Sequence, residues 1–189
     1  MNKKEIKNLI RREIKLKREN LELNEKIKLS SIIIKKFLNL EELKKIKTIM
    51  SYMDFKNEVE TKGLNKNLLK IGKRVLIPKI DEENDKIIPI ILTEEYQKGK
   101  YGILESNGVK FLENIDLIIV PGIVFNEKGE RIGFGKGYYD KFLSEYENKN
   151  KKILKVSLLY EFQIDNRFNG EEHDKNIDIL ITERRIIKL

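Results

Sequence analysis

The stretch DLIIVPGIVFNEKGERIGFGKGYYDKFL, residues 116–143, joins an apolar run to a glycine-rich segment and then to a helical pattern. Its first part, DLIIVPG, lacks alternation of apolar and polar residues, which is typical of a strand covered on both faces of a sheet. Open α/β sheets bind ligands beyond the carboxyl ends of their strands. We therefore expect the connection over residues 122–137 to lie where a functional site would form.

The segment RIGFGKGYYD, residues 131–140, has three glycines at alternate positions. Glycines let backbone amides approach a ligand closely, and the start of the following helix would favour an anion. Lys136 would add a point charge, Arg131 could grip two phosphate oxygens, and Asp140 could hold Mg²⁺. The spacing matches neither a Walker loop nor a dinucleotide fingerprint. The residues alone leave two interpretations open, a phosphate-binding loop and a plain glycine-rich connection.

Further apolar runs predict strands on either side of this segment, at residues 48–53, 74–78, 87–92, 153–159 and 178–182. Pro89 cannot donate a ladder hydrogen bond, so we place the run that contains it at a sheet edge. Strands that alternate with helices predict an α/β fold with a largely parallel sheet.

Helical patterns dominate the first quarter of the chain. Apolar residues recur at three- and four-residue steps, as Ile6, Leu9, Ile10 and Ile14 in the first helix and Ile27, Ile34, Phe37 and Leu38 in the second, over residues 23–38. The same first helix carries a second, basic stripe of Lys7, Arg11, Lys15 and Arg18. A shorter helical pattern covers residues 41–46, and another covers 61–71 and ends at Gly72 as a cap.

Composition narrows the class of protein. The chain has 189 residues, one domain by length, and a formal charge of +8 from 39 Lys and Arg against 31 Asp and Glu. Because the basic residues are interleaved with acids, we do not expect a nucleic-acid partner. The absence of cysteine and the single histidine, His173, argue against thiolate sites, serine triads and multi-histidine metal sites. Without an apolar run long enough for a signal peptide or a membrane span, we expect a soluble cytoplasmic protein with no membrane association.

Read as a whole, residues 116–143 resemble the signature of the 5-formyltetrahydrofolate cyclo-ligase (methenyltetrahydrofolate synthetase) family: a strand, Pro-Gly, a turn bearing Phe, and Arg-x-Gly-x-Gly-x-Gly-Tyr-Tyr-Asp. Four other segments resemble the family in the same order along the chain: KNLIRREIKLKR (7–18), YMDFKNEVET (52–61), YGILES (101–106) and EEHDKNIDILITE (171–183). The ordered set covers nearly the full chain.

The resemblance implies a three-layer α/β/α fold with a largely parallel or mixed sheet, similar to the sugar-phosphate isomerase and CoA-transferase group. It also implies conversion of 5-formyltetrahydrofolate, with or without a polyglutamate tail, to 5,10-methenyltetrahydrofolate by a monomeric enzyme that uses ATP and Mg²⁺ and releases ADP and phosphate. The formyl oxygen would attack the terminal phosphate of ATP, and N10 of the folate would then close the ring. Phosphoryl transfer of this kind needs positioning and charge stabilisation more than a strong base.

The resemblance also assigns residues to roles. ATP would contact Lys7, Arg11, Arg131, Ile132, Gly133, Phe134, Gly135, Lys136, Gly137, Tyr138 and Tyr139. The folate would contact Met53, Glu58, Phe134, Gly135, Lys136, Gly137 and Tyr138. Asp140 and Asp174 would hold Mg²⁺, and Lys136, Arg131 and Tyr138 would act on the reacting groups. In terms of chemistry, a carboxylate such as Glu58 can accept two hydrogen bonds from the guanidine-like edge of a pterin.

The chain departs from the family pattern at three positions. Asn126 stands where members often have Asp, Ser106 where many have Pro, and Lys136 where many bacterial members have Gly, although Lys also occurs there. Three alternatives stay open: an enzyme of similar fold with another substrate, a folate or nucleotide binder without turnover, and a basic nucleic-acid-binding module.

Overall fold

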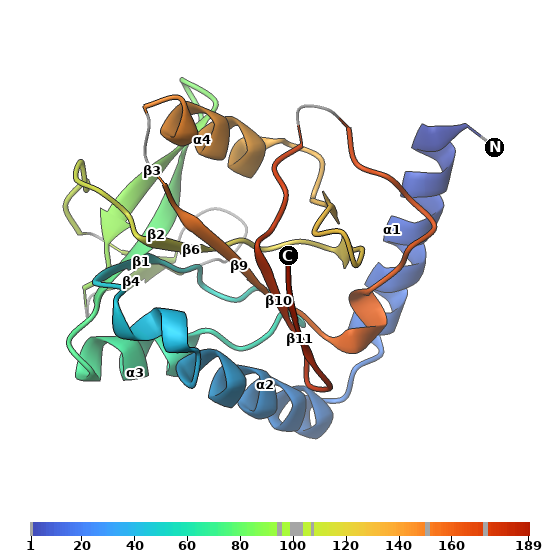
Figure 1. Cartoon of the computed structure of the whole chain (residues 1–189), viewed down its shortest axis with the longest axis horizontal. Helices are drawn as coiled ribbons and strands as arrows, with labels where there is room; N and C mark the ends of the chain where they lie inside the picture. The colour runs from blue at the N-terminus through green and yellow to red at the C-terminus, as the bar shows by residue number, and fades with distance from the viewer. Residues whose placement is uncertain (1, 94–95, 99–103, 107, 150–151, 172–173) are drawn as a thin grey trace.

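A seven-stranded mixed sheet forms the centre of the molecule, in the order β11-β10-β9-β6-β1-β2-β3 (Figure 1). The computed structural model describes residues 2–93, 96–98, 104–106, 108–149, 152–171 and 174–189. The inner strands are parallel: β10 (Ile179–Ile181), β9 (Leu154–Leu158), β6 (Leu117–Ile119), β1 (Thr48–Met50) and β2 (Arg74–Asp81). The edge strands β3 (Lys86–Ile91) and β11 (Ile186–Lys188) pair antiparallel with their neighbours.

Helices cover both faces of the sheet, which confirms the three-layer α/β/α arrangement (Figure 1). The covering helices are α2 (Leu23–Leu38) and α3 (Lys62–Lys70) on one face and α4 (Tyr138–Glu147) on the other. Phe37 and Leu64 pack in one core cluster with Ile49, whereas Leu143 packs in another with Ile118. Strand side chains alternate between faces, so successive residues of one strand serve the two clusters.

Helix α1 (Lys3–Glu19) lies beside the sheet rather than on a face of it (Figure 1). It begins with a capping box, in which Asn2 and Glu5 bond reciprocally to each other's backbone N–H. Its buried Ile10 and Ile14 pack against the hairpin of β7 (Val124–Phe125) and β8 (Arg131–Ile132). This packing turns the basic stripe of α1 toward the glycine segment.

Most predicted elements are confirmed. Pro89 lies on the edge strand β3, as predicted. Gly72 has φ +76°, and the N–H groups of Gly72 and Lys73 bond to Leu69 and Leu68, which is the Schellman end of a helix. The prediction of a single strand over residues 48–53 was wrong, because β1 (Thr48–Met50) ends at Met50 and the chain continues as a loop.

Other differences have local causes. Ile27 is 46% exposed rather than core-facing, since Lys26 and Ser30 occupy the buried side of α2. Residues 41–46 form only a short 3-10 helix, Glu41–Lys44. The sequence patterns missed β11, the β7–β8 hairpin inside residues 122–137, and the pair β4 (Tyr96–Lys98) and β5 (Leu104–Ser106), all of three residues or fewer.

Some sequence predictions lie outside the described residues. They concern residues 101–103 of YGILES, the Ser106 side chain and His173. Among the described residues, no helix has the length and apolar character needed to cross a membrane.

Candidate active site

The glycine segment lies between β8 and α4, beyond the carboxyl end of β6. Gly135 and Gly137 have φ of +99° and +69°, in the left-handed region where residues with a side chain are strained. Among described atoms, a Cβ added at either of them or at Gly133 would meet nothing within 4 Å. Core packing therefore does not explain the glycine at position 133, and the backbone of the segment is open to a ligand. Lys136 is exposed beside it.

Helix α1 brings one predicted ATP contact, Arg11, to this segment and another, Lys7, to Glu171 and Asp174. Arg11 Nε donates to the carbonyl of Gly133 at 3.2 Å, and partial burial lowers the pKa of Arg11. Lys7 Nζ lies 2.7 Å from Glu171 Oε1 and 3.7 Å from Asp174 Oδ2. The basic stripe could have been an ordinary solvated helix face, but Arg11 joins α1 to the glycine segment and Lys7 joins it to Glu171 and Asp174.

Arg131 and Asp140 contact each other directly. Arg131 Nη2 lies 2.8 Å from Asp140 Oδ1, and Nη1 donates to the carbonyl of Lys175 at 2.8 Å. The backbone N–H of Lys175 donates to the same carboxylate oxygen at 3.2 Å. Because Asp174 immediately precedes Lys175, the segment that carries the second predicted metal ligand is held against Asp140.

The two aspartates suit a magnesium ion by the chemistry of their donor atoms. Mg²⁺ in phosphate-handling sites takes one or two carboxylates and completes its shell with water and substrate phosphates. Asp140 and Asp174 are both partly exposed, and each is oriented by a backbone N–H, from Lys175 and Glu171 respectively. Within the described part of the chain, no group of three or more His, Cys, Asp or Glu residues could by itself enclose a metal ion.

Glu58 occupies a buried position on the loop after β1. Its Oε2 accepts the N–H of Phe55 at 3.0 Å, and its Oε1 lies 3.6 Å from Arg18 Nη2. Burial raises the pKa of Glu58, and the positive charge of Arg18 offsets part of that rise. Met53 is also buried nearby in the sequence, and the Asn65 amide contacts its sulfur at 3.6 Å. The loop thus holds a carboxylate whose negative charge is unfavourable in its buried site. A strong hydrogen-bond donor from a ligand would stabilise that charge.

Arg18 was not predicted as a site residue. Its place in the basic stripe, seven residues after Arg11, puts both on one side of α1. That spacing was a usable signal, but nothing in it pointed to Glu58, which is 40 positions away along the chain.

The two adjacent tyrosines face different neighbours. Burial raises the pKa of Tyr139, the negative charge of Glu58 raises it further, and the positive charge of Arg131 opposes the rise. Desolvation also raises the pKa of Tyr138, followed by the charge of Asp85 and a hydrogen bond with it. Tyr139 therefore lies within electrostatic reach of both the predicted folate carboxylate and the arginine beside Asp140, whereas Tyr138 contacts the β2–β3 turn.

The sequence pattern of the 5-formyltetrahydrofolate cyclo-ligase family matches residues 3–183. The chain belongs to this family. The cyclo-ligase relatives include a probable 5-formyltetrahydrofolate cyclo-ligase of Schizosaccharomyces pombe, 34% identical over 82% of this chain and 84% of the relative. The solved structure of Aquifex aeolicus 5,10-methenyltetrahydrofolate synthetase superimposes with a TM-score of 0.83, at 34% identity over 97% of this chain and 93% of that one. The structure of a 5,10-methenyltetrahydrofolate synthetase from Mycoplasma pneumoniae superimposes with a TM-score of 0.75, at 29% identity over 94% of this chain and 98% of that one.

One departure from the cyclo-ligase pattern has a structural explanation. Asn126 is buried in the β7–β8 turn, where its Oδ1 accepts the N–H groups of Lys128 and Glu130 at 3.1 and 3.0 Å. Its Nδ2 donates to Glu130 Oε2 and to the carbonyl of Phe168 at 3.2 Å. An aspartate could not make the last two bonds, so the amide fits this hairpin.

Proposed function

We propose that this chain converts 5-formyltetrahydrofolate to 5,10-methenyltetrahydrofolate with ATP and Mg²⁺, releasing ADP and phosphate. Family membership supports the reaction. The observation that carries the proposal is that helix α1 contacts both predicted binding regions: Arg11 Nε donates to the carbonyl of Gly133 at 3.2 Å, and Arg18 Nη2 lies 3.6 Å from Glu58 Oε1. We infer that the carboxylate suited to a pterin and the glycine segment suited to phosphate belong to one site.

The reaction has two bond-forming steps. The formyl oxygen attacks the terminal phosphorus of ATP, the bond to the ADP oxygen breaks, and the formyl group becomes an O-phosphorylated iminium that is still bonded to N5. N10 of the folate then attacks the formyl carbon, the carbon–oxygen bond breaks as phosphate leaves with the original formyl oxygen, and N10 loses its proton to the departing phosphate. The protein contributes orientation and charge stabilisation, which together can supply most of the catalysis in phosphoryl transfer.

Residues of the glycine segment would act at the phosphates. The amides of residues 133–137 and the ammonium of Lys136 would stabilise negative charge on the transferred group. Lys7 and Arg11 would add positive charge from α1. Arg131 is almost fully buried and bonded to Asp140 and Lys175, so its role would be to hold those groups in place and to add charge from behind the phosphates.

Glu58 and the tyrosines would act at the folate. The Glu58 carboxylate would accept hydrogen bonds from the pterin, with Met53, Phe134 and Tyr138 lining the site. Desolvation strengthens such a charge-assisted bond.

Asp140 and Asp174 would hold Mg²⁺. The ion, when bound, would neutralise charge on the phosphates. We further propose that the enzyme is a single-domain, cytoplasmic monomer that accepts polyglutamylated substrate and binds neither nucleic acid nor membrane.

An enzyme assay that follows both products tests the proposal. Purified protein is mixed with 5-formyltetrahydrofolate, ATP and Mg²⁺, and methenyl product is followed by its absorbance, with release of ADP measured in parallel. We expect ATP-dependent product. Binding of both ligands without ADP release would instead indicate a non-catalytic binder, and no product under conditions where a known cyclo-ligase works would refute the assignment.

A further inference from the structure

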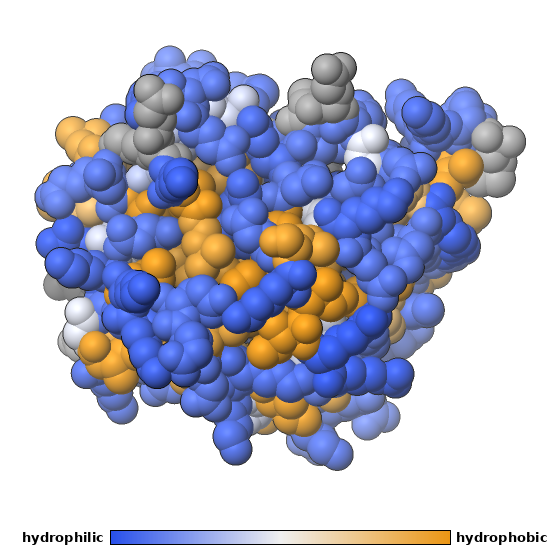
Figure 2. Space-filling model, in the orientation of Figure 1, coloured by the Kyte–Doolittle hydropathy of each residue, from blue (hydrophilic) through white to orange (hydrophobic). Residues whose placement is uncertain are grey.

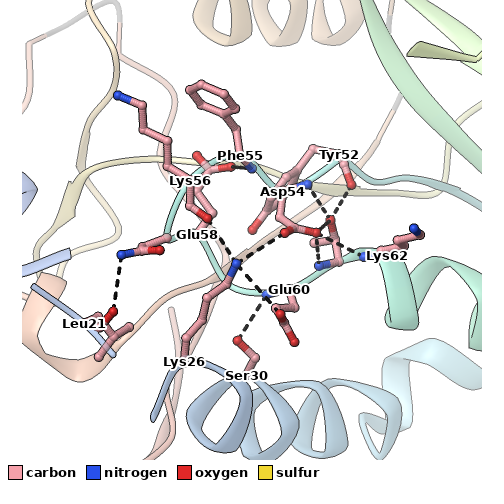
Figure 3. Close-up of polar contacts among 12 residues, drawn as sticks. Leu21, Lys26, Ser30, Tyr52, Asp54, Phe55, Lys56, Glu58, Glu60 and Lys62 are labelled. Carbon is pink, nitrogen blue, oxygen red and sulfur yellow. Dashed lines mark hydrogen bonds and ion pairs between the residues drawn. The ribbon is translucent and has the colours of Figure 1, made fainter. Parts of the chain in front are cut away.

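The loop over residues 54–60, which carries Glu58, is anchored by a buried lysine from α2. Lys26 Nζ donates to the carbonyl of Lys56 at 3.0 Å and lies 3.6 Å from Asp54 Oδ2 and 3.8 Å from Glu60 Oε1. Figure 3 shows its side chain rising from α2 into the concave side of the loop. The Lys26 side chain is only 10% exposed. One cation therefore contacts the loop on both sides of Glu58, two residues before it and two residues after it.

Burial of an ammonium group is costly unless acceptors compensate for the lost water. Here one carbonyl and two carboxylates surround it. Asp54 also uses its other oxygen, which accepts the N–H groups of Thr61 at 2.9 Å and Lys62 at 3.2 Å where α3 begins (Figure 3). Lys26 thus couples the position of α2 to the start of α3 through the loop between them.

The loop needs such support because its backbone is strained. Lys56 has φ +51°, in the left-handed region that is unfavourable for a residue with a side chain. Two neutral bonds add to the anchoring: Ser30 Oγ accepts the N–H of Glu60 at 3.1 Å, and Asn57 Nδ2 donates to the carbonyl of Arg18 at 2.5 Å. Without the cation, the Asp54 and Glu60 carboxylates would be left with less compensation around the strained turn.

We propose that Lys26 is a positioning residue for folate: it holds loop 54–60 in the conformation that presents the Glu58 carboxylate to the pterin before the substrate arrives. The inference rests on the proposed role of Glu58 in folate binding. It adds a determinant of folate affinity that is not part of the phosphate-binding segment.

The test compares Lys26→Met with Lys36→Met. Lys36 lies on the same helix and also donates to backbone carbonyls, those of Thr182 at 3.0 Å and Glu183 at 2.9 Å, at the far end of α2. KM for 5-formyltetrahydrofolate and KM for ATP are measured separately, with the thermal midpoint of each variant. We expect Lys26→Met to raise the folate KM about tenfold and to leave the ATP KM within about twofold, because loss of a binding contact appears in the KM of the ligand concerned. Lys36→Met should change neither.

Equal rises in both KM values, or a Lys26→Met profile that matches Lys36→Met, would overturn the proposal, since a purely structural lysine predicts either. If Lys26→Met does not fold, Lys26→Gln keeps a donor for the Lys56 carbonyl but removes the charge; a wild-type ratio of the two KM values there also overturns it. Glu58→Gln is measured in parallel. If that variant has a normal folate KM, the proposed role of Glu58 fails, whereas a raised folate KM in Glu58→Gln alone rejects only the role of Lys26.

Discussion

Arg131 and Asp140 form an ion pair, with Nη2 2.8 Å from Oδ1, and the arginine side chain is only 4% exposed. The pair joins the start of the glycine segment to the first turn of α4 across the three glycines. Because the guanidinium also holds the carbonyl of Lys175, it fixes the spacing between the two proposed magnesium ligands. The sequence suggested that Arg131 binds two phosphate oxygens. In the structure its guanidinium instead contacts Asp140 and the segment that carries Asp174.

Asp140→Asn should reduce both turnover and stability. The amide cannot balance the charge of buried Arg131, so we expect a loss of about 2 kcal/mol in the free energy of unfolding, typical of a hydrogen bond to a charged group. Turnover should fall at least about 100-fold, since a charged group at the phosphates is removed. Chemical denaturation and the methenyl assay measure the two effects. Glu113→Gln, which breaks the exposed Arg74 ion pair, is the control and should leave turnover unchanged.

Lys136→Ala should reduce turnover strongly without a cost in stability. The side chain is exposed on the glycine segment, so its loss leaves the core intact. We expect kcat to fall about 100-fold or more, because removal of one donor that stabilises transition-state charge has an effect of this size in other enzymes. The thermal midpoint should equal that of wild type. The matched control is Lys44→Ala, an exposed lysine in the 3-10 helix before β1. Near-normal kcat in Lys136→Ala would remove Lys136 from the reaction.

Glu58→Gln should weaken folate binding while leaving the fold as stable as wild type or more so at pH 7. Burial raises the pKa of Glu58 in spite of Arg18, so the folded protein binds this proton more tightly than the unfolded chain does. Stability from this group is therefore fully present below the unfolded pKa and is lost as the pH rises through the raised folded pKa.

The neutral glutamine escapes that loss. Denaturation curves are measured from about pH 4 upward, which is near the ordinary carboxyl pKa. The free energy of unfolding should fall less steeply with rising pH in the variant than in wild type. A variant that is clearly less stable than wild type at pH 7 would show that the Arg18 contact outweighs the cost of burial.

Tyr139→Phe should impair the enzyme more than Tyr138→Phe. In addition to burial, the charges of Glu58 and Arg131 both act on the pKa of Tyr139, whereas the charge of Asp85 on the β2–β3 turn and a hydrogen bond with it act on that of Tyr138. We expect about a tenfold loss of kcat/KM for folate in Tyr139→Phe and a smaller loss in Tyr138→Phe, in keeping with one lost hydrogen bond near a charge. The two variants form their own matched pair, and the reverse order would assign the substrate contact to Tyr138.

The sequence by itself determined that strands lie in the runs 74–78 and 116–122, which the structure has as β2 (Arg74–Asp81) and β6 (Leu117–Ile119). It also determined the edge position of Pro89 and the glycine cap at Gly72. These depend on local rules: the burial pattern of a strand, the missing N–H of proline and the left-handed geometry that glycine tolerates. The ordered motifs also pointed to the family, which is confirmed. The strands of the β7–β8 hairpin have two residues each, which is too short for periodicity to reveal.

Only the tertiary structure decided which charged groups meet. Arg18 reaches Glu58 across 40 positions and Lys26 reaches Lys56 across 30, and many other lysines in this chain have the same local pattern. Helix α1 contacts the glycine segment only because Ile10 and Ile14 pack on the β7–β8 hairpin. A charge pair depends on distance and burial, which packing sets and which spacing along the chain does not encode.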